Sequence, residues 1–195
     1  MENIKKEDIQ KSAAVIANAM YDDPLHIYFF PNLKSRGKKI YKLYCFMVKI
    51  NCGNTYKTSS GYEGIIIYEE PFRHGYIISP SDFFRGLLLF FTIGLPSMIR
   101  LIKYQKWAEQ IKNDNIREPY WYLNLVTVAR EFRHKGFASK LIKPILALAD
   151  ENCQKVCLET QNPDNVPIYE RYGFSTVSKK ILPGTDVIHY FMVRG

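Results

Sequence analysis

The second half of this 195-residue chain alternates between strand-like and helix-like segments, which limits the possible folds more than any other feature of the sequence. β-Branched and aromatic runs predict the strands, and apolar side chains at helical spacing predict the helices between them. The expected order is strand 121–129, helix 137–150, strand 156–160, short helix 164–172, strand 174–178 and strand 187–193. Strands that alternate with helices and end in a hairpin predict an α/β fold built on one mixed sheet.

The first half of the chain is mainly helical. Apolar residues recur on one face of residues 9–20, and residues 40–48 repeat this pattern. The β-branched run 64–68 predicts a buried strand, and further helices are expected from residue 81 and over residues 97–112. The helical block from residue 81 to residue 112 could be a lid, a wall of a substrate site or plain core packing. Because the sequence shows no linker and no internal repeat, we expect one domain spanning residues 1–195.

A basic loop that contains one glycine lies between the strand 121–129 and the helix that follows it. Its residues are Arg133, His134, Lys135, Gly136, Phe137 and Ala138. The first turn of a helix has N–H groups without intrahelical partners and carries partial positive charge. Gly136 lets the backbone turn tightly and approach a ligand. The loop therefore predicts an anion site that a pyrophosphate would span, although a short motif of this kind can also be a chance basic turn.

A second motif follows one strand later. Asp164 or Asn165 can cap a helix that accepts Pro167 in its first turn, and Gly173 suits a left-handed helix end. With these two motifs the chain resembles the GNAT superfamily of N-acetyltransferases. The residues that carry the resemblance are Leu125, Val126, Thr127 and Val128, then Arg133, Gly136 and Ala138, then Asn165, Tyr169, Tyr172, Gly173 and Phe174. The resemblance is clear over residues 121–193 and weak before them.

The resemblance implies the acyl-CoA N-acyltransferase (GNAT) fold, an α/β fold with a mixed, mostly antiparallel central sheet and helices on both faces. It implies a helical half, residues 1–115, that shapes the acceptor site and a half, residues 119–195, that binds acetyl-CoA as co-substrate. In this fold the strand before the loop carries a bulge and splays from its neighbour, and acyl-CoA lies in the opening. The residues implied to contact it are Val126, Thr127, Val128, Arg133, His134, Lys135, Gly136, Phe137, Ala138, Ser139 and Asn165.

Tyr169 matches the tyrosine that commonly protonates the departing CoA sulfur in this superfamily. A phenol with a pKa of about 10 can donate to a thiolate whose conjugate acid lies near 8.5. The implied reaction is direct attack of a primary amine on the thioester in a ternary complex, with a strand N–H stabilising the oxyanion. The group that deprotonates the amine stays open. The candidates by residue type alone are Glu159, Glu118, His74 and Tyr122, and for each of them a structural or merely exposed position is the simpler interpretation.

The resemblance leaves the acceptor open as a small-molecule amine or a peptide. We expect its walls to come from residues 21–30 and from the apolar block 83–99. Asp22 and Asp23 could attract a cationic amine, although a solvated acidic turn is the simpler interpretation. The alternative to an enzyme is a non-catalytic module that binds or senses CoA.

Composition narrows the partners and the location. The formal net charge of +8 favours an anionic partner, but the basic clusters lack interleaved aromatics spaced for base stacking, so we expect no nucleic acid. The apolar stretch 86–99 is shorter than the ~20 residues that a spanning helix needs, so we expect no membrane partner. The cysteines fit no zinc spacing and no apolar segment opens the chain, which favours a cytoplasmic protein without a metal. A monomer and a homodimer are both compatible with the sequence.

Overall fold

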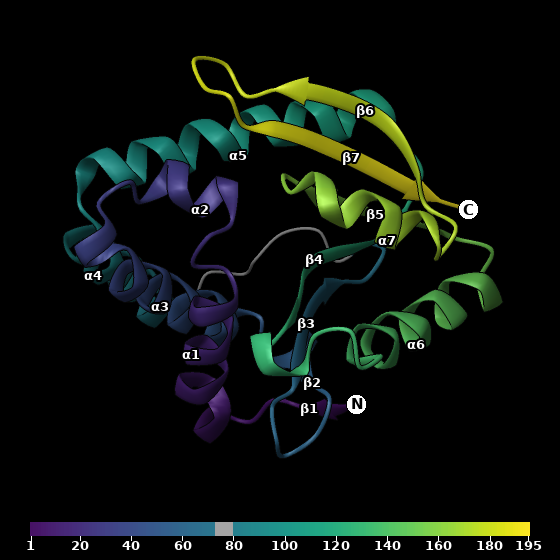
Figure 1. The fold of residues 1–195 in the computed structure, drawn as a ribbon, viewed down its shortest axis with the longest axis horizontal. Helices are drawn as coiled ribbons and strands as arrows, with labels where there is room; N and C mark the ends of the chain where they lie inside the picture. Colours follow the sequence, from purple (N-terminus) through teal and green to yellow (C-terminus); the bar gives the residue numbers. More distant parts are fainter. Residues whose placement is uncertain (73–79) are drawn as a thin grey trace.

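The computed structural model describes the backbone of residues 1–72 and 80–195 and the side chains of residues 1–72 and 86–195 (Figure 1). The helices are α1 Ile9–Ala19, α2 Pro24–Phe29, α3 Leu33–Ile50, α4 Pro80–Ile93, α5 Leu95–Asn115, α6 Phe137–Glu151 and α7 Val166–Glu170. The strands are β1 Glu2–Asn3, β2 Thr55–Lys57, β3 Gly64–Glu69, β4 Tyr120–Val128, β5 Lys155–Thr160, β6 Ser175–Ile181 and β7 Ile188–Arg194. Every strand and helix expected from the sequence is present, most of them within a few residues of the predicted bounds, although α3 begins at Leu33, well before the expected start at residue 40.

The strands form one sheet in the order β1-β2-β3-β4-β5-β7-β6. The pair β4–β5 is parallel, and the other neighbouring pairs are antiparallel. Helix α6 covers one face, and α1, α3 and α5 pack on the other (Figure 1). The expected mixed, mostly antiparallel sheet with helices on both faces is confirmed.

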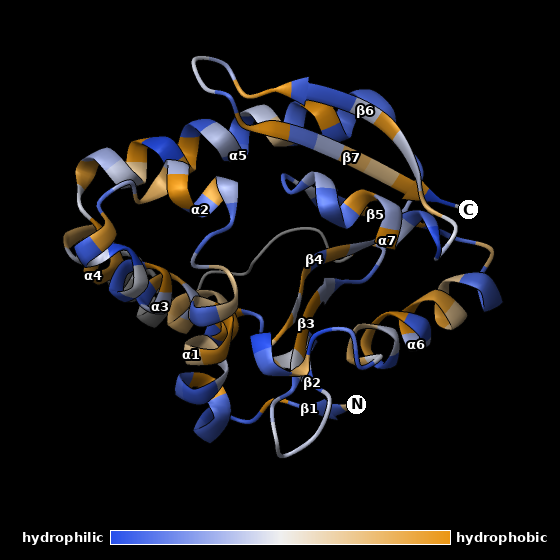
Figure 2. Ribbon diagram, viewed as in Figure 1, coloured by the Kyte–Doolittle hydropathy of each residue, from blue (hydrophilic) through white to orange (hydrophobic). Residues whose placement is uncertain are grey.

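Alternating side chains of β3 separate the two cores. Ile65 and Ile67 pack against the helices of the first half, whereas Ile66 and Tyr68 pack against α6. Strict alternation is what a strand buried on both faces requires, because successive side chains point to opposite sides of a sheet. Figure 2 shows the resulting hydrophobic stretches along β3, β4 and α6.

A β-bulge interrupts β4. Ile67 pairs with Leu125, but the next residue of β3, Tyr68, pairs with Leu123, which leaves Asn124 as an extra residue on β4. Leu123 therefore packs in the core under α6, while Leu125 packs in the core of the first half. The bulge redirects β4 at its middle.

The parallel strands β4 and β5 separate just beyond this point. Residues 120–123 of β4 pair with residues 155–158 of β5, and the described pairing ends there. Beyond the last pair, Leu123 with Leu158, the two strands diverge. The splay expected from the resemblance is therefore part of the structure.

The first half contains elements that the sequence did not predict. Helix α2 begins directly after the expected turn, because the Asp23 side chain accepts hydrogen bonds from the N–H groups of Leu25 and His26. The short strand β1 pairs with β2 at the sheet edge. Within the described residues no single helix is long and apolar enough to cross a membrane, although 86–93 and Leu95–Asn115, bent by 117°, pass that test as a pair.

Candidate active site

The loop between β4 and α6 has the backbone geometry of an anion site. Gly136 adopts a left-handed conformation with φ of 80° and is the N-cap of α6. A Cβ added to Gly136 would have no atom within 4 Å, so the space beside its backbone is open to a ligand. His134 also has a positive φ, 62°. The loop therefore fits a phosphate group at the start of α6, where unpaired N–H groups and the helix dipole attract an anion.

Two arginines attach this loop to the end of α1. Arg133 Nη2 donates to the carbonyl oxygen of Ala19 at 3.0 Å, and Arg130 Nε donates to that of Asn18 at 3.1 Å. Arg130 also forms an ion pair with Asp22 at 2.6 Å. Arg133 thus has a structural contact as well as its expected role beside a phosphate.

A cavity of about 1070 Å³ lies where β4 and β5 separate. Of the residues expected to contact acetyl-CoA or catalyse the reaction, Val126, Asn165 and Tyr169 line it. The loop residues 133–139 lie outside the cavity wall, but Met20, which follows the Ala19 carbonyl that binds Arg133, is part of it. The cavity and the loop are therefore neighbours around the end of α1.

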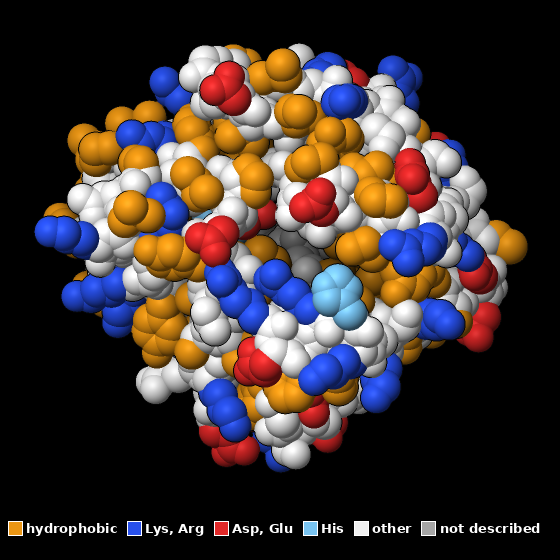
Figure 3. Space-filling view, viewed as in Figure 1, with side chains coloured by type: hydrophobic (Ala, Val, Ile, Leu, Met, Phe, Trp, Pro, Cys, Tyr) orange, Lys and Arg blue, Asp and Glu red, His pale blue; other side chains and the backbone are white. Residues whose placement is uncertain are grey.

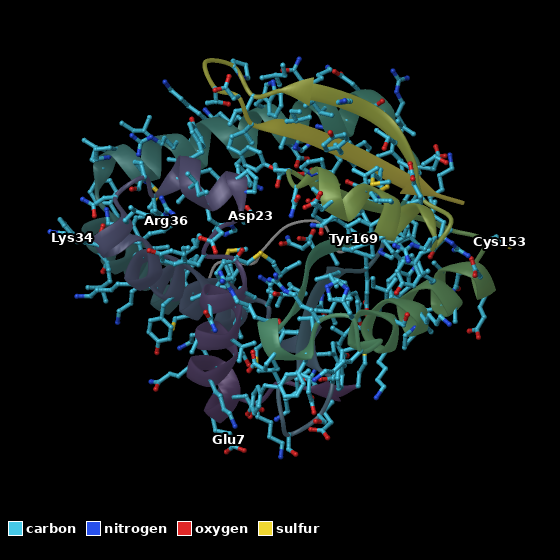
Figure 4. The ribbon with its side chains drawn as sticks, in the orientation of Figure 1. Glu7, Asp23, Lys34, Arg36, Cys153 and Tyr169 are labelled. Atoms are coloured by element: carbon cyan, nitrogen blue, oxygen red, sulfur yellow. The ribbon has the colours of Figure 1, made fainter. Side chains whose placement is uncertain are left out.

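The Tyr169 side chain projects from α7 into this cavity. Its ring packs edge-on against Phe174, with centroids 5.9 Å apart. Burial, with a smaller contribution from Tyr172, raises the pKa of Tyr169 to about 12, so its phenol stays protonated at neutral pH. Figure 4 shows Tyr169 and Asp23 on opposite sides of the cavity, one from α7 and the other from the start of α2. Tyr169 is thus a half-buried proton donor where the splayed strands open.

Glu159 of β5 lies in the same cavity wall, within a polar network. Tyr104 donates to its Oε2 at 3.1 Å, and Gln161 Nε2 lies 2.8 Å from the Tyr104 hydroxyl and 3.0 Å from His189 Nδ1. Burial raises the pKa of Glu159, while Lys112 and the hydroxyls of Tyr104 and Tyr122 oppose the rise. Burial also lowers the pKa of His189 to about 4, helped by Lys112 and Lys180.

The space-filling view shows a hollow near the centre of one face (Figure 3). Lys and Arg side chains and a histidine gather at its lower edge, where the β4–α6 connection runs in Figure 1, and acidic side chains lie above it. The rim of the site is therefore basic on the side of the loop.

Several expected residues lie elsewhere. Thr127 is buried and Val128 ends β4, and neither is among the described residues that line the cavity. The expectation that the block 83–99 forms an acceptor wall is wrong for its described side chains. Residues 86–99 contribute none to the cavity, and Phe91 is 73% exposed. The wall comes instead from α5 between Leu101 and Lys112.

Two smaller expectations are also corrected. The helical turn before α7 is capped by Asn162, whose Oδ1 accepts from the N–H of Asp164 at 3.0 Å, whereas Asn165 donates to Thr160 Oγ1. Asp23 lines the cavity but is occupied as the cap of α2. Among the candidate bases, Tyr122 and Glu159 line the cavity, exposed Glu118 forms an ion pair with Lys155, and His74 lies outside the described residues.

Sequence reasoning missed Tyr104, Gln161, His189 and Lys112. Tyr104 and Lys112 are buried on α5, which the sequence predicted only as a helix over residues 97–112. Their spacing of eight residues would have placed them on one helix face, but nothing in the sequence connected that face with β5.

Residues 98–174 match the model of the acetyltransferase (GNAT) family, a segment that contains both the loop and Tyr169. The resemblance to the GNAT superfamily is therefore confirmed. An uncharacterised N-acetyltransferase of Schizosaccharomyces pombe is 27% identical over 185 residues, covering 88% of this chain and 72% of that protein. These two matches support an acyltransferase.

Solved GNAT structures share the fold. A Corynebacterium glutamicum structure described as histone acetyltransferase HPA2 and related acetyltransferase superposes with a TM-score of 0.65 at 18% identity, over 98% of this chain and 92% of that one. The NatC complex bound to Gag peptide and CoA superposes with a TM-score of 0.53 at 16% identity, over 100% of this chain and 98% of that one. At these identities the likeness concerns the fold alone.

Proposed function

We propose that this GNAT protein transfers the acetyl group of acetyl-CoA to a primary amine by direct attack in a ternary complex. The observation that carries the proposal is the opening between β4 and β5, which leads into a cavity lined by Tyr169 beside the open Gly136 loop. A thioester in that opening would be next to Tyr169, a half-buried proton donor, while its phosphates met the start of α6. The acceptor is a small-molecule amine or a peptide, and the protein acts in the cytoplasm.

The two halves of the chain have different roles in this proposal. Residues 119–195 hold acetyl-CoA, and residues 1–115 supply most of the remaining cavity wall. The backbone of β4 binds the pantetheine arm and presents an N–H to the thioester oxygen. The loop and the start of α6 bind the pyrophosphate through backbone N–H groups, assisted by basic side chains. The residues assigned to acetyl-CoA are Val126, Thr127, Val128, Arg133, His134, Lys135, Gly136, Phe137, Ala138, Ser139 and Asn165.

The departing CoA thiolate needs a proton, and in this proposal Tyr169 supplies it. A neutral amine forms the N–C bond, and a backbone N–H stabilises the oxyanion until the C–S bond breaks. Tyr169 then protonates the thiolate, and its phenolate recovers a proton from the nitrogen that becomes the amide. The products are the acetylated amine and CoA thiol, with one proton released when the acceptor arrives as an ammonium ion.

An acetyl-CoA turnover screen tests this function. Release of CoA thiol would be followed with arylalkylamines, polyamines, amino acids and lysine peptides, and the acetylated product identified by mass. We expect at least one class to be acetylated and acetyl-CoA to raise the melting temperature. An unchanged melting temperature would contradict acetyl-CoA binding, and binding without turnover on any amine would favour the non-catalytic CoA-binding module.

A matched pair of glycine variants tests the loop. Gly136→Glu places a carboxylate at the anion site, whereas Gly184→Glu makes the same change in the β6–β7 turn. Both glycines have a positive φ, 80° and 75°, and open space around them, so the backbone strain is alike. We expect only Gly136→Glu to weaken acetyl-CoA binding, by roughly tenfold or more, since repelling one phosphate charge costs at least about 1.4 kcal/mol. Equal affinities in the two variants would contradict this placement of the pyrophosphate.

A further inference from the structure

The cavity has the opposite sign of charge from the molecule around it. The chain carries a net charge of +8, yet the charged groups that line the cavity in the described part of the chain are mainly acidic. They are the carboxylates of Asp23, Glu69, Glu109 and Glu159 and the ammonium of Lys112. The other titratable side chains that line it are His26, Tyr44, Tyr104, Tyr120, Tyr122 and Tyr169. An acidic interior behind a basic rim favours a cationic acceptor.

Three of these carboxylates already have partners. Asp23 caps α2 and accepts from His26 Nδ1 at 2.9 Å. Glu69 accepts from Asn124 Nδ2 at 2.9 Å, and Glu109 forms an ion pair with Lys112 at 3.1 Å. The fourth, Glu159, differs from them.

One oxygen of Glu159 is buried without a hydrogen-bond partner among the described residues. Tyr104 donates to Oε2 and the Tyr122 hydroxyl also lies beside the carboxylate, but Oε1 itself accepts no hydrogen bond. A buried carboxylate oxygen without a donor is costly, because the group has lost water and gained nothing in exchange. Such an orphaned acceptor in a cavity wall is therefore a site for a ligand's donor.

The position of Glu159 matches the place where the amine must arrive. It is the first residue of β5 after the pairing with β4 ends at Leu158, so it lies where the two strands diverge. On its other side Glu159 pairs with Phe191 of β7, which fixes its backbone within the sheet. The carboxylate is thus held at the splay, in the cavity that Tyr169 also lines.

A chain of hydrogen bonds holds the Glu159 side chain from behind. Gln161 Nε2 donates to His189 Nδ1 and to the Tyr104 hydroxyl, so Tyr104 is left to donate its own proton to Glu159 Oε2. The chain leaves Oε1 as the only oxygen of this carboxylate without a protein donor among the described residues. Tyr104 and Gln161 are accordingly positioning residues.

We propose that Glu159 binds the acceptor's ammonium group through Oε1 and accepts its proton, and that the acceptor is a primary amine on an apolar or aromatic body. The apolar part would lie against Phe29, Leu43, Tyr44, Met47 and Leu101, which line the same cavity. This inference rests on the proposed acetyl transfer. One ammonium proton moves to the Glu159 carboxylate, the neutral amine attacks the thioester, and Glu159 later releases the proton to water.

The burial that raises the pKa of Glu159 supports this role, because a carboxylate with a raised pKa is a stronger base. Lys112 and the hydroxyls of Tyr104 and Tyr122 oppose this rise. Cavity walls that carry aromatic rings also suit a cation, through its attraction to the ring faces.

A binding experiment tests the ammonium site without requiring turnover. Phenethylamine, 2-phenylethanol and 3-phenylpropanoate share one apolar body and differ in the charge of the head group. Calorimetric titration in the presence of CoA should show preference for the amine in the wild type and loss of that preference in Glu159→Gln. Glu118→Gln, which removes an exposed carboxylate outside the cavity, should keep the preference. Equal binding of the three probes, or an amine preference that persists in Glu159→Gln, would overturn the proposal.

Kinetics with the amine that reacts fastest then tests the role of Glu159 separately from the proposed acetyl transfer. Glu159→Gln should lower kcat/KM for the amine by about 10²-fold or more and leave the Kd for acetyl-CoA within about twofold. Tyr104→Phe should shift the acid limb of the kcat/KM profile to higher pH, because the lost hydrogen bond had lowered the pKa of Glu159. A wild-type rate in Glu159→Gln would refute the role of Glu159 while acetyl transfer stood. No acetylation by the wild type, with probe preference intact, would refute the transfer function and leave the ammonium site.

Discussion

The hydroxyl groups of Ser139 and Tyr172 lie 2.7 Å apart, and this hydrogen bond joins the first turn of α6 to the turn that follows α7. The first element belongs to the proposed pyrophosphate site, and the second follows directly on the helix that carries Tyr169. The contact therefore couples the two parts of the site that must meet one acetyl-CoA molecule, one at its phosphates and the other at its sulfur.

Removing this contact should loosen the coupling without deleting either site. Tyr172→Phe is expected to lower the free energy of unfolding by about 1 kcal/mol, the usual net value of one hydrogen bond. It should raise KM for acetyl-CoA more than it lowers kcat. Urea denaturation and steady-state kinetics would measure both effects. Tyr190→Phe is the control, since Tyr190 is a buried tyrosine that is not among the described residues lining the cavity. Equal effects of the two substitutions would contradict the coupling.

Tyr169→Phe should lower kcat by about 10²-fold or more, the usual contribution of a positioned general acid. Acetyl-CoA affinity should change little, because the ring and its packing on Phe174 remain. The wild-type enzyme should show no fall in kcat assignable to Tyr169 below about pH 11, because burial raises its pKa to about 12 and the acid form persists. Wild-type turnover by Tyr169→Phe would remove the acid role and leave the cofactor site untouched.

The structure of residues 119–195 was largely predictable from the sequence, because its main features depend on local patterns. A left-handed glycine next to a helix, such as Gly136 before α6 and Gly173 after α7, leaves a signal within a few residues. Hydrophobic periodicity likewise located α6 and the strands beside it. Features that depend on a few neighbouring residues can be predicted from the sequence in this way.

Features that depend on contacts between distant parts of the chain could not be predicted from the sequence. The bulge at Asn124 follows from register with β3, and the network at Glu159 joins α5, β5 and β7. Tyr104 and Glu159 are 55 positions apart in the chain, so no local pattern connects them. The apolar block 83–99 was wrongly predicted to form a wall of the acceptor site, because hydrophobicity alone does not show which side of a helix faces a cavity.

Asp8 anchors a buried polar cluster far from the cavity. Its Oδ1 accepts from Lys57 Nζ at 3.0 Å and from the Tyr62 hydroxyl. The Tyr62 hydrogen bond, followed by the N–H of Lys5, lowers the pKa of Asp8 to about 2. A lowered folded-state pKa stabilises the fold above the unfolded value of 3.8, and the benefit is lost as pH falls toward 2. Asp8→Asn should therefore destabilise the protein at pH 7 and differ less from wild type below pH 4.

Urea unfolding at pH 7, 4 and 3 would measure that convergence. Glu7→Gln is a matched control, because Glu7 is an exposed carboxylate in the same turn. A stability gap for Asp8→Asn that stayed constant from pH 7 to pH 3 would show that the cluster acts through packing and not through charge.

His189 should make stability depend on pH near neutrality. It is fully buried, and burial together with Lys112 and Lys180 lowers its pKa from 6.5 to about 4. The unfolded chain therefore binds a proton between pH 6.5 and 4 that the folded chain does not, and this group's stabilisation falls by about 1.4 kcal/mol per pH unit across that window. The raised pKa of Glu159 works in the opposite direction, since its folded carboxyl takes up a proton more readily as pH falls.

His189→Gln separates these two opposing contributions. Glutamine keeps a polar group beside Gln161 but does not titrate, so the variant should be less stable than wild type at pH 7.5 and should approach it as pH falls toward 4. Differential denaturation at half-unit pH steps would give the gap as a function of pH. A gap independent of pH would mean that His189 is not held neutral by burial, while a gap that widened on acidification would mean that the folded protein binds its proton more tightly than the unfolded chain does.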